Sequence, residues 1–289
     1  MTTINEITCN EKPQWCVGCG DFSVLMGVKT ALAELGLPQH ETVLVSGIGC
    51  CSKSPHYVNT YGFESLHGRS LPVASAIKLA NNKLSVIAIS GDGDGYGIGV
   101  QHFIHIGRRN FDLTYIVCDN QLYGLTTGQA SPTTIKGVKS KSTPHGVIET
   151  QFNPIASAIV NGATYVARAY AGDLKHMTEI IKGAITHRGF ALVDIFQPCV
   201  TFNKLNTYQW FQERVYKLED SGHKTDDKLA ALTKAWEETN SEYKKVPIGV
   251  FYKENRPTYE DELPQLKEKP LVQHDISKVD ISKAYAEFE

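Results

Sequence analysis

The sequence predicts an α/β protein with a doubly wound, mostly parallel sheet and a helical and extended C-terminal tail. Short apolar runs rich in β-branched residues alternate with amphipathic helical segments, an order that produces parallel sheets covered on both faces. Two of these runs, residues 84–90 and 113–118, end at Gly or Asp and indicate buried strands. Ligands bind at the carboxyl ends of such strands in open α/β sheets.

The N-terminal half supplies the first elements. We expect a loop over residues 1–20 and then a helix over 21–35, whose apolar residues Leu25, Val28 and Leu32 follow helical spacing before Gly36 and Pro38 end it. The remaining expected segments follow in order: a buried strand 42–46 with a glycine-rich turn after it, an irregular segment 55–70, a helix 73–81, and the strands 84–90 and 113–118.

The C-terminal half continues the alternation after a polar loop at 130–150, which contains Pro and Gly and suggests a mobile or partner-covered connection. Its expected segments are a helix from 155 to 160, a strand 164–168, a helix through Leu174, Met177, Ile181 and Ile185, and a strand 190–195 that leads to Pro198 and Cys199. Composition changes near residue 212, so we divide the chain into a ligand-binding domain, 1–212, and a C-terminal part, 213–289. The latter should contain a charged helix 226–243, a strand 246–252 and a tail too polar to fold alone, lying on the body or on a partner subunit.

Composition excludes several classes of protein. The 289 residues have a net charge of −2, which argues against a nucleic-acid surface, and no apolar run approaches the roughly 18 residues that span a membrane. The N-terminus lacks the basic and apolar segments of a secretory signal. Seven cysteines, an odd number, then favour free thiols in a reducing compartment, and we expect a cytoplasmic location.

The region from residue 84 to 129 contains the main candidate for chemistry. Asp92 follows the strand 84–90 within Gly91–Gly95, and Asn120 follows the strand 113–118. The 25 residues between Gly93 and Asp119 allow one crossover helix, so both side chains should face one crevice. Magnesium prefers few protein oxygens and phosphate oxygens beside them. We therefore predict a magnesium–diphosphate site, with a backbone carbonyl just past Asn120 as a third ligand; two ordinary Gly and Asn turns are the alternative.

An EF-hand calcium loop is a competing interpretation of Asp92-Gly93-Asp94. It fails because Tyr96 falls where an oxygen ligand is required and Phe103 falls where the bidentate Glu should be.

Four of the cysteines lie at predicted loops or strand ends: Cys16, Cys19, Cys50 and Cys199. Four thiolates hold either a structural zinc or a cubane iron–sulfur cluster, and one CxxC with two distant single cysteines leaves the cluster, zinc and no metal all open. The other three cysteines are weaker candidates. Cys118 lies within a predicted strand and is expected in the core, Cys9 is close to the start of the chain, and Cys51 adjoins Cys50.

Five motifs occur in an order that resembles one enzyme family: Cys16-Val17-Gly18-Cys19-Gly20, Gly47-Ile48-Gly49-Cys50, His67-Gly68-Arg69, Gly91-Asp92-Gly93-Asp94-Gly95 and Tyr123-Gly124-Leu125-Thr126. So arranged, they resemble the β subunit of the 2-oxoacid:ferredoxin oxidoreductases, from about Trp15 to Tyr252. The resemblance implies a thiamine diphosphate-binding fold (the diphosphate domain), thiamine diphosphate, Mg²⁺ and one [4Fe-4S] cluster.

The resemblance also implies residue roles. Mg²⁺ would be bound by Asp92, Asn120 and the carbonyl of Leu122, and the cluster by Cys16, Cys19, Cys50 and Cys199. The implied cofactor contacts are Ile48, Gly49, Cys50, Cys51, His67, Gly91, Gly93, Asp94, Gly124 and Leu125.

Three residues are candidates for a more direct part in catalysis. Leu125 would be the apolar wedge that keeps the cofactor bent, with plain core as the alternative. His67 would contact the cofactor, although a His between Leu and Gly also suits a surface loop. Lys53, with Arg69 as a second choice, would neutralise the substrate carboxylate; both are otherwise solvated charges.

The family reaction is a coenzyme A-dependent oxidative decarboxylation of a 2-oxoacid, with electrons leaving to ferredoxin. This chain has length for the diphosphate domain only, so an α subunit with the pyrimidine-binding domain should complete the site. Residues 59–63 with 67–69 resemble the 2-oxoglutarate subgroup; pyruvate or a broad range of 2-oxoacids stays open. A non-redox thiamine decarboxylase or synthase, and a non-catalytic iron–sulfur electron-transfer subunit, are the competing functions.

Overall fold

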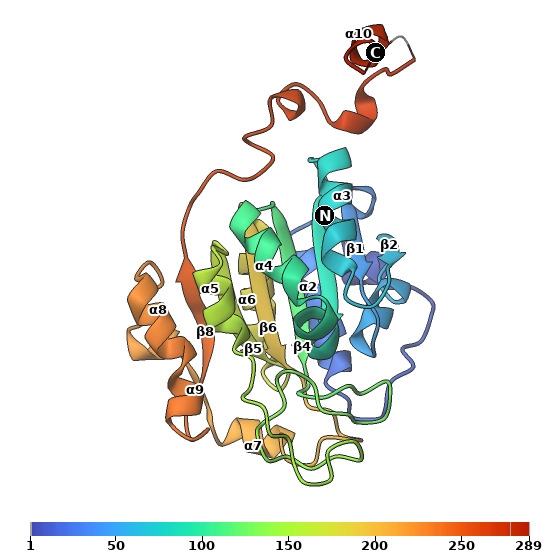
Figure 1. Cartoon of the computed structure of the whole chain (residues 1–289). Coiled ribbons are helices and arrows are strands. Elements are labelled where there is room, and N and C mark those ends of the chain that lie inside the picture. Colours follow the sequence, from blue (N-terminus) through green and yellow to red (C-terminus); the bar gives the residue numbers. More distant parts are fainter. Residues whose placement is uncertain (1, 278, 289) are drawn as a thin grey trace.

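The computed structural model describes residues 2–277 and 279–288, which form an eight-stranded sheet covered by helices on both faces (Figure 1). The strand order is β2-β1-β3-β4-β6-β5-β8-β7. Neighbouring strands are parallel except β5 and β8, which are antiparallel. The strands are β1 (Thr42–Ser46), β2 (Tyr61–Glu64), β3 (Ser85–Gly91), β4 (Leu113–Asp119), β5 (Tyr165–Tyr170), β6 (Phe190–Phe196), β7 (Val215–Lys217) and β8 (Val246–Lys253).

The helices fall into two layers because successive side chains of a strand point to opposite faces. In β3, Val86 and Ala88 join one core and Ile87 and Ile89 join the other. The first core includes residues of α3 (Ser70–Ala80), α4 (Val100–Arg109), α5 (Pro154–Val160) and α8 (Lys228–Ala235). The second includes residues of α1 (Ile4–Ile7), α2 (Asp21–Glu34) and α6 (Leu174–Thr186). The predicted doubly wound, mostly parallel sheet is confirmed.

Several local predictions were wrong. The expected loop 1–20 contains α1, whose first turn is held by a capping box between Thr3 and Glu6. The expected irregular segment 55–70 contains β2, a four-residue edge strand that exists through its pairing with β1. The expected helix 73–81 begins three residues earlier, at Ser70.

The charged helix expected over 226–243 is broken at Trp236 into α8 and α9 (Glu237–Asn240). The short elements α7 (Tyr208–Gln212) and β7 were not predicted, because neither is long enough to show a period. None of the described helices combines the length and apolar character needed to cross a membrane.

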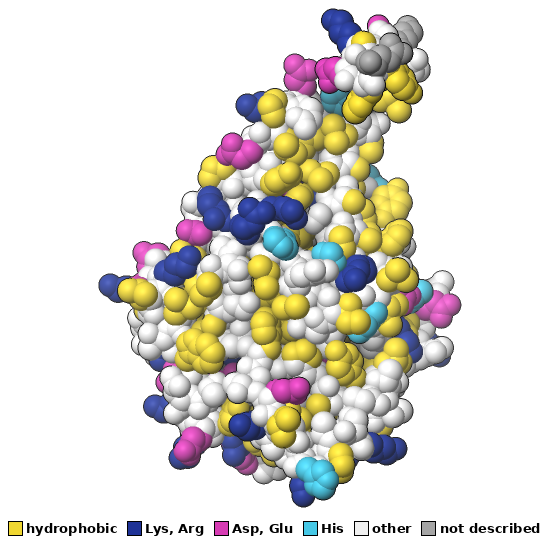
Figure 2. Space-filling model, viewed as in Figure 1, with side chains coloured by type: hydrophobic (Ala, Val, Ile, Leu, Met, Phe, Trp, Pro, Cys, Tyr) yellow, Lys and Arg dark blue, Asp and Glu magenta, His cyan; other side chains and the backbone are white. Residues whose placement is uncertain are grey.

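The C-terminal tail first follows the body and then leaves it. Tyr259 stacks on Phe111, and the Leu266 carbonyl accepts a hydrogen bond from the Asn82 side chain. The 3-10 turn Leu271–Gln273 still lies against α3, and the chain then runs away from the body to α10 (Ser282–Ala286) (Figure 1). Hydrophobic side chains gather on this projecting segment (Figure 2), where Ile276, Val279, Ile281, Tyr285 and Phe288 are exposed.

Candidate active site

A cleft of about 170 Å³ opens at the carboxyl ends of β3 and β4. Turns that follow β1, β3 and β4 form its walls, together with His67 from the loop before α3. Two larger hollows, of about 980 and 610 Å³, border the loop 130–150. We assign the site to the smaller cleft because carboxylates, glycine backbone and a thiol converge there, at the sheet edge where α/β proteins bind ligands.

The cleft gathers residues that are up to 78 positions apart in the sequence. Its lining comprises Ile48, Gly49, Cys50, Cys51, His67, Gly91, Asp92, Gly93, Asp94, Asn120, Leu122, Tyr123, Gly124, Leu125 and Thr126. All ten residues expected to contact a cofactor, and the three expected to bind Mg²⁺, are therefore in one place. Leu125 is 51% exposed, so it belongs to the cleft and not to the core.

Of the three residues expected to take a direct part in catalysis, Lys53 lies outside the lining, whereas His67 and Leu125 belong to it. Lys53 lies in the 3-10 helix Cys51–His56, just past the glycine turn, and is half-buried. Its charge is nevertheless near enough to oppose the rise in the pKa of Cys50. Arg69 donates to the Gly68 carbonyl at 3.2 Å, beside the start of α3.

Asp94 organises two walls of the cleft. Its buried Oδ1 accepts hydrogen bonds from the backbone N–H groups of Ile48, at 3.1 Å, and Gly68, at 2.6 Å. The same oxygen lies 2.9 Å from Nδ1 of His67. A Cβ on Gly47 would lie 1.8 Å from Asp94 Oδ2, so only glycine fits where the first turn crosses this carboxylate. Asp94 thus fixes the turn after β1 and the Gly68 backbone next to His67.

Asp92 presents a buried carboxylate and is 1% exposed. Its Oδ2 lies 2.6 Å from the Thr133 hydroxyl, which also lies 2.7 Å from Oδ1 of Asp119. One hydroxyl carries one proton, so it can donate to only one of the two carboxyl groups at a time. Burial, then the charges of Asp194 and Asp92, raise the pKa of Asp119 well above its usual value, so Asp119 holds a proton more readily than an ordinary carboxyl group.

Burial is also the main cause that raises the pKa of Asp92, to about 6. Asp92 is therefore mostly ionised at neutral pH and can attract a cation. The Oδ1 of Asn120 accepts from the Leu122 N–H at 3.1 Å and keeps a second lone pair. Within the described residues, the Leu122 carbonyl accepts no hydrogen bond from the chain. This set of hard oxygen donors fits Mg²⁺.

The glycines leave room for a ligand. A Cβ on Gly49 would meet nothing closer than Ser52 Oγ at 3.8 Å, and one on Gly91 nothing closer than Cys51 Sγ at 3.9 Å. Side chains there would stand in the open cleft, so glycine keeps backbone N–H groups accessible to an anion. Gly93 differs, since a Cβ would lie 2.2 Å from the Tyr123 ring. The donors and the free volume fit a diphosphate with its metal ion.

The four candidate cluster cysteines belong to segments that the structure joins by backbone contacts. The Cys19 N–H bonds to the Cys16 carbonyl at 3.0 Å, and the Gly20 N–H bonds to the Pro198 carbonyl at 3.2 Å. The Trp15 indole N–H donates to the Cys50 carbonyl at 2.7 Å. Burial first, and the Cys199 charge among the smaller causes, raises the pKa values of Cys19 and Cys50, the latter to about 12.

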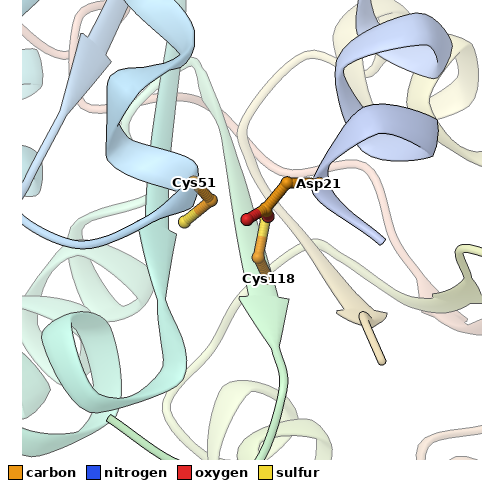
Figure 3. A group of neighbouring side chains, drawn as sticks. All are labelled: Asp21, Cys51 and Cys118. Atoms are coloured by element: carbon orange, nitrogen blue, oxygen red, sulfur yellow. The ribbon is translucent and has the colours of Figure 1, made fainter. Parts of the chain in front are cut away.

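Cys51 has different neighbours from Cys50. Its thiol, the Cys118 thiol and an Asp21 carboxylate oxygen all lie within 4.8 Å of one another, and all three residues are buried (Figure 3). Burial raises the pKa of Asp21 to about 7, and the Cys19 thiol donates to Asp21 Oδ2 at 3.4 Å. Because the Cys51 thiol packs inward in this group, Cys50 is the better candidate for ligating a cluster.

Two residues of the site were not found from the sequence. Thr133 lies in the loop 130–150, which gives no periodic signal, and its contacts with Asp92 and Asp119 need the fold to bring them together. Gln197 bonds to Asn120 at 3.2 Å and to Cys19 Sγ at 3.3 Å. The sequence offered one signal for Gln197, which directly follows a buried strand and precedes Cys199 by two residues.

Comparison with known proteins identifies the class of protein to which this fold and cleft belong. Residues 47–195 match the family model described as "Thiamine pyrophosphate enzyme, C-terminal TPP binding domain". Residues 199–268 match the family model for the C-terminal part of the pyruvate ferredoxin oxidoreductase β subunit. The chain therefore contains a thiamine diphosphate-binding domain.

Proteins that match most of the chain narrow this class to one enzyme family. The chain is 47% identical to the β subunit of 2-oxoacid:ferredoxin oxidoreductase 1 of Aeropyrum pernix, over 87% of this chain and 81% of that one. It is 48% identical to the Saccharolobus solfataricus 2-oxoacid:ferredoxin oxidoreductase β subunit, over 86% and 85%. A solved 2-oxoglutarate:ferredoxin oxidoreductase from Magnetococcus marinus, with 2-oxoglutarate, coenzyme A and succinyl-CoA bound, superposes with a TM-score of 0.90 and 38% identity, covering 100% of this chain and 96% of that one. The chain belongs to the β-subunit family of the 2-oxoacid:ferredoxin oxidoreductases.

Proposed function

We propose that the chain holds thiamine diphosphate, Mg²⁺ and a [4Fe-4S] cluster, and serves in the coenzyme A-dependent oxidative decarboxylation of a 2-oxoacid. The products are acyl-CoA and CO₂, and two electrons pass through the cluster to ferredoxin. One observation carries the proposal: Cys50, a candidate cluster ligand, lines the same cleft as Asp92 and Asn120. The cofactor and the cluster would then share a wall, as one-at-a-time electron transfer requires.

In this proposal the residues of the cleft hold and orient the cofactor. Asp92, Asn120 and the Leu122 carbonyl bind Mg²⁺, and the backbone of the glycine turns faces the diphosphate. Bound thiamine diphosphate would accept the electron pair that remains when the bond to the departing carboxylate breaks. Leu125 contributes an apolar surface at the mouth of the cleft, and His67 lies in its wall with Nδ1 2.9 Å from Asp94 Oδ1.

The thiols of Cys16, Cys19, Cys50 and Cys199 would bind the cluster. Burial keeps Cys19 and Cys50 protonated before a cluster binds, so loading the cluster must release protons to the solvent. All seven cysteines are free, which suits the reducing cytoplasm where we place the protein.

For the substrate we propose 2-oxoglutarate, because the similar Magnetococcus marinus enzyme has it bound. Lys53, beside Cys50, is the proposed cation for a substrate carboxylate. An α subunit would supply the pyrimidine-binding part of the site and cover the exposed side of Leu125. The projecting tail with its exposed apolar residues is a second surface that we propose for contact with a partner chain.

The test is to purify the chain anaerobically, alone and co-expressed with its α subunit. The complex should contain about four iron and four sulfide per β chain, as a cubane does, and should reduce a viologen dye when given 2-oxoglutarate and coenzyme A. The isolated chain should not reduce the dye. A complex with thiamine diphosphate and no iron would favour a non-redox thiamine enzyme. One with iron and no thiamine diphosphate would favour an electron-transfer subunit.

A further inference from the structure

Gln197 connects the two proposed sites through one side chain. It directly follows β6 and is 1% exposed. Its Oε1 accepts a hydrogen bond from Asn120 Nδ2 at 3.2 Å, and its Nε2 lies 3.3 Å from Cys19 Sγ. A proposed magnesium ligand and a proposed cluster ligand therefore contact opposite ends of the same amide.

The surrounding hydrogen bonds determine which way this amide points. Asn120 Oδ1 already accepts from the Leu122 N–H at 3.1 Å, so the Asn120 amide nitrogen must face Gln197. That nitrogen is a donor, which requires the oxygen of Gln197 on its side. A ligating Cys19 thiolate is an acceptor only, which requires the nitrogen of Gln197 on the other side. Gln197 Nε2 donates its second proton to the Pro198 carbonyl at 3.1 Å.

The backbone and packing hold Gln197 in place. Its N–H donates to the Asp119 carbonyl at 3.0 Å, which fixes it to the end of β4. A Cβ on Gly20 would lie 2.9 Å from Gln197 Cγ and 3.0 Å from its Nε2. Glycine at position 20 thus allows the CxxC turn to lie directly against this amide, and the Gly20 N–H bonds to the neighbouring Pro198 carbonyl.

We propose that Gln197 is a positioning residue for both groups, an inference that rests on the proposed function. Its oxygen orients Asn120 so that the Asn120 oxygen is presented to Mg²⁺. Its N–H bonds to the sulfur of Cys19, which stabilises the more negative, reduced form of the cluster and raises its reduction potential. Cys50 brings the cluster close to the cofactor, and Gln197 sets how readily the cluster accepts an electron.

Two substitutions separate the two ends of the amide. Gln197→Glu keeps an acceptor for Asn120 and the same volume, removes the donor to Cys19, and adds a negative charge that lowers the potential in the same direction. Gln197→Met keeps the length and removes both hydrogen bonds. Gln209→Met, at an exposed glutamine of α7, is the matched control.

The variants are compared with the parent as anaerobic complexes with the α subunit, by redox titration of the cluster and by calorimetry of thiamine diphosphate binding in Mg²⁺. Both Gln197 variants should have a lower reduction potential, with the equilibrium constant for reduction falling about tenfold, which is about 59 mV for one electron. Gln197→Met should also bind thiamine diphosphate several-fold more weakly, whereas Gln197→Glu should keep the parental affinity. Gln209→Met should change neither quantity.

A purely structural role would lower iron content or thermal stability while the loaded molecules kept the parental potential and affinity, and that result would overturn the inference. Gln197→Met decides the origin of the shift because it adds no charge: a loaded Gln197→Met complex with the parental potential would overturn the inference even if Gln197→Glu had a lower one. If the unsubstituted complex contained neither iron nor thiamine diphosphate, the proposed function itself would fail. Parental values in both variants of a loaded complex would reject the role of Gln197 alone.

Discussion

Replacement of Arg168 by methionine tests how the sheet supports the cleft. Arg168 lies in β5 and is 3% exposed; its Nε is 2.9 Å from Asp194 Oδ2 and its Nη1 is 2.7 Å from Glu238 Oε2. The other oxygen of Asp194 accepts from the Tyr96 hydroxyl at 2.9 Å. Tyr96 belongs to the π-helical turn Gly93–Ile98 that directly follows Asp92. The guanidinium therefore stabilises the segment that contains the cleft carboxylates.

The substitution keeps most of the apolar contact but leaves two buried carboxylates without their cation. Removing one partner of a buried ion pair costs about 3–5 kcal/mol. For a chain of this size that is a fall in Tm of about 6–20 °C. Burial is the largest cause that raises the pKa values of Asp194 and Glu238, and Arg168 opposes this rise. In Arg168→Met both carboxyl groups should therefore take up protons more readily. The loss should then be largest at neutral pH and smaller as the pH falls.

Urea denaturation at pH 7 and pH 5 measures this loss. The control is Arg188→Met, because Arg188 has a 71% exposed side chain and pairs with Asp261 at the surface. Exposed pairs contribute about 0–1 kcal/mol. If Arg168→Met lost no more stability than Arg188→Met, or lost the same amount at both pH values, the buried Arg168 ion pairs would not have the stabilising role described above.

Three further predictions concern the cleft, the cluster and pH. Asp92→Asn removes the charge of a proposed Mg²⁺ ligand and should weaken thiamine diphosphate binding in Mg²⁺ at least tenfold by calorimetry, whereas the exposed control Asp220→Asn should not. Equal affinities would remove Asp92 from the proposed metal site. Cys51→Ala should keep about four irons per chain and Cys50→Ala should lose them, because a cubane needs its four thiolates; the reverse outcome in iron analysis would exchange their roles. Burial lowers the pKa of His187 to about 4, so the folded chain holds it neutral. Its contribution to stability is complete above about pH 6.5, the pKa of an unfolded His, and is lost as the pH falls toward 4. In His187→Gln the urea midpoint should depend less on pH over that range, and an unchanged dependence would contradict the assignment.

The sequence was sufficient to predict the central part of the fold. The runs 84–90 and 113–118 became β3 and β4 because a buried parallel strand needs apolar residues on both faces and therefore reads clearly. Parallel pairing of these two strands places their carboxyl ends side by side, which is why Asp92 and Asn120 line one cleft. The order of motifs then indicated the family, and the comparisons confirmed it.

The remaining features depend on contacts that no local pattern encodes. The edge strand β2 is stabilised by β1, and Thr133 meets Asp92 from 41 residues away. Gln197 meets Cys19 from 178 residues away. The inward packing of the Cys51 thiol follows from the positions of Asp21 and Cys118 on other elements. Such polar contacts are set by tertiary structure, so composition and periodicity cannot reveal them.

We propose that a thiamine diphosphate cleft and an iron–sulfur cluster share a wall in this chain. The shared wall is tested most directly by electron paramagnetic resonance of the anaerobic complex with its α subunit, after addition of 2-oxoglutarate without coenzyme A or ferredoxin. We predict that the substrate alone produces the signal of a reduced [4Fe-4S] cluster, and that Asp92→Asn abolishes this response while dithionite still produces the signal. A cluster that dithionite reduces and no 2-oxoacid reduces would contradict the proposed shared wall.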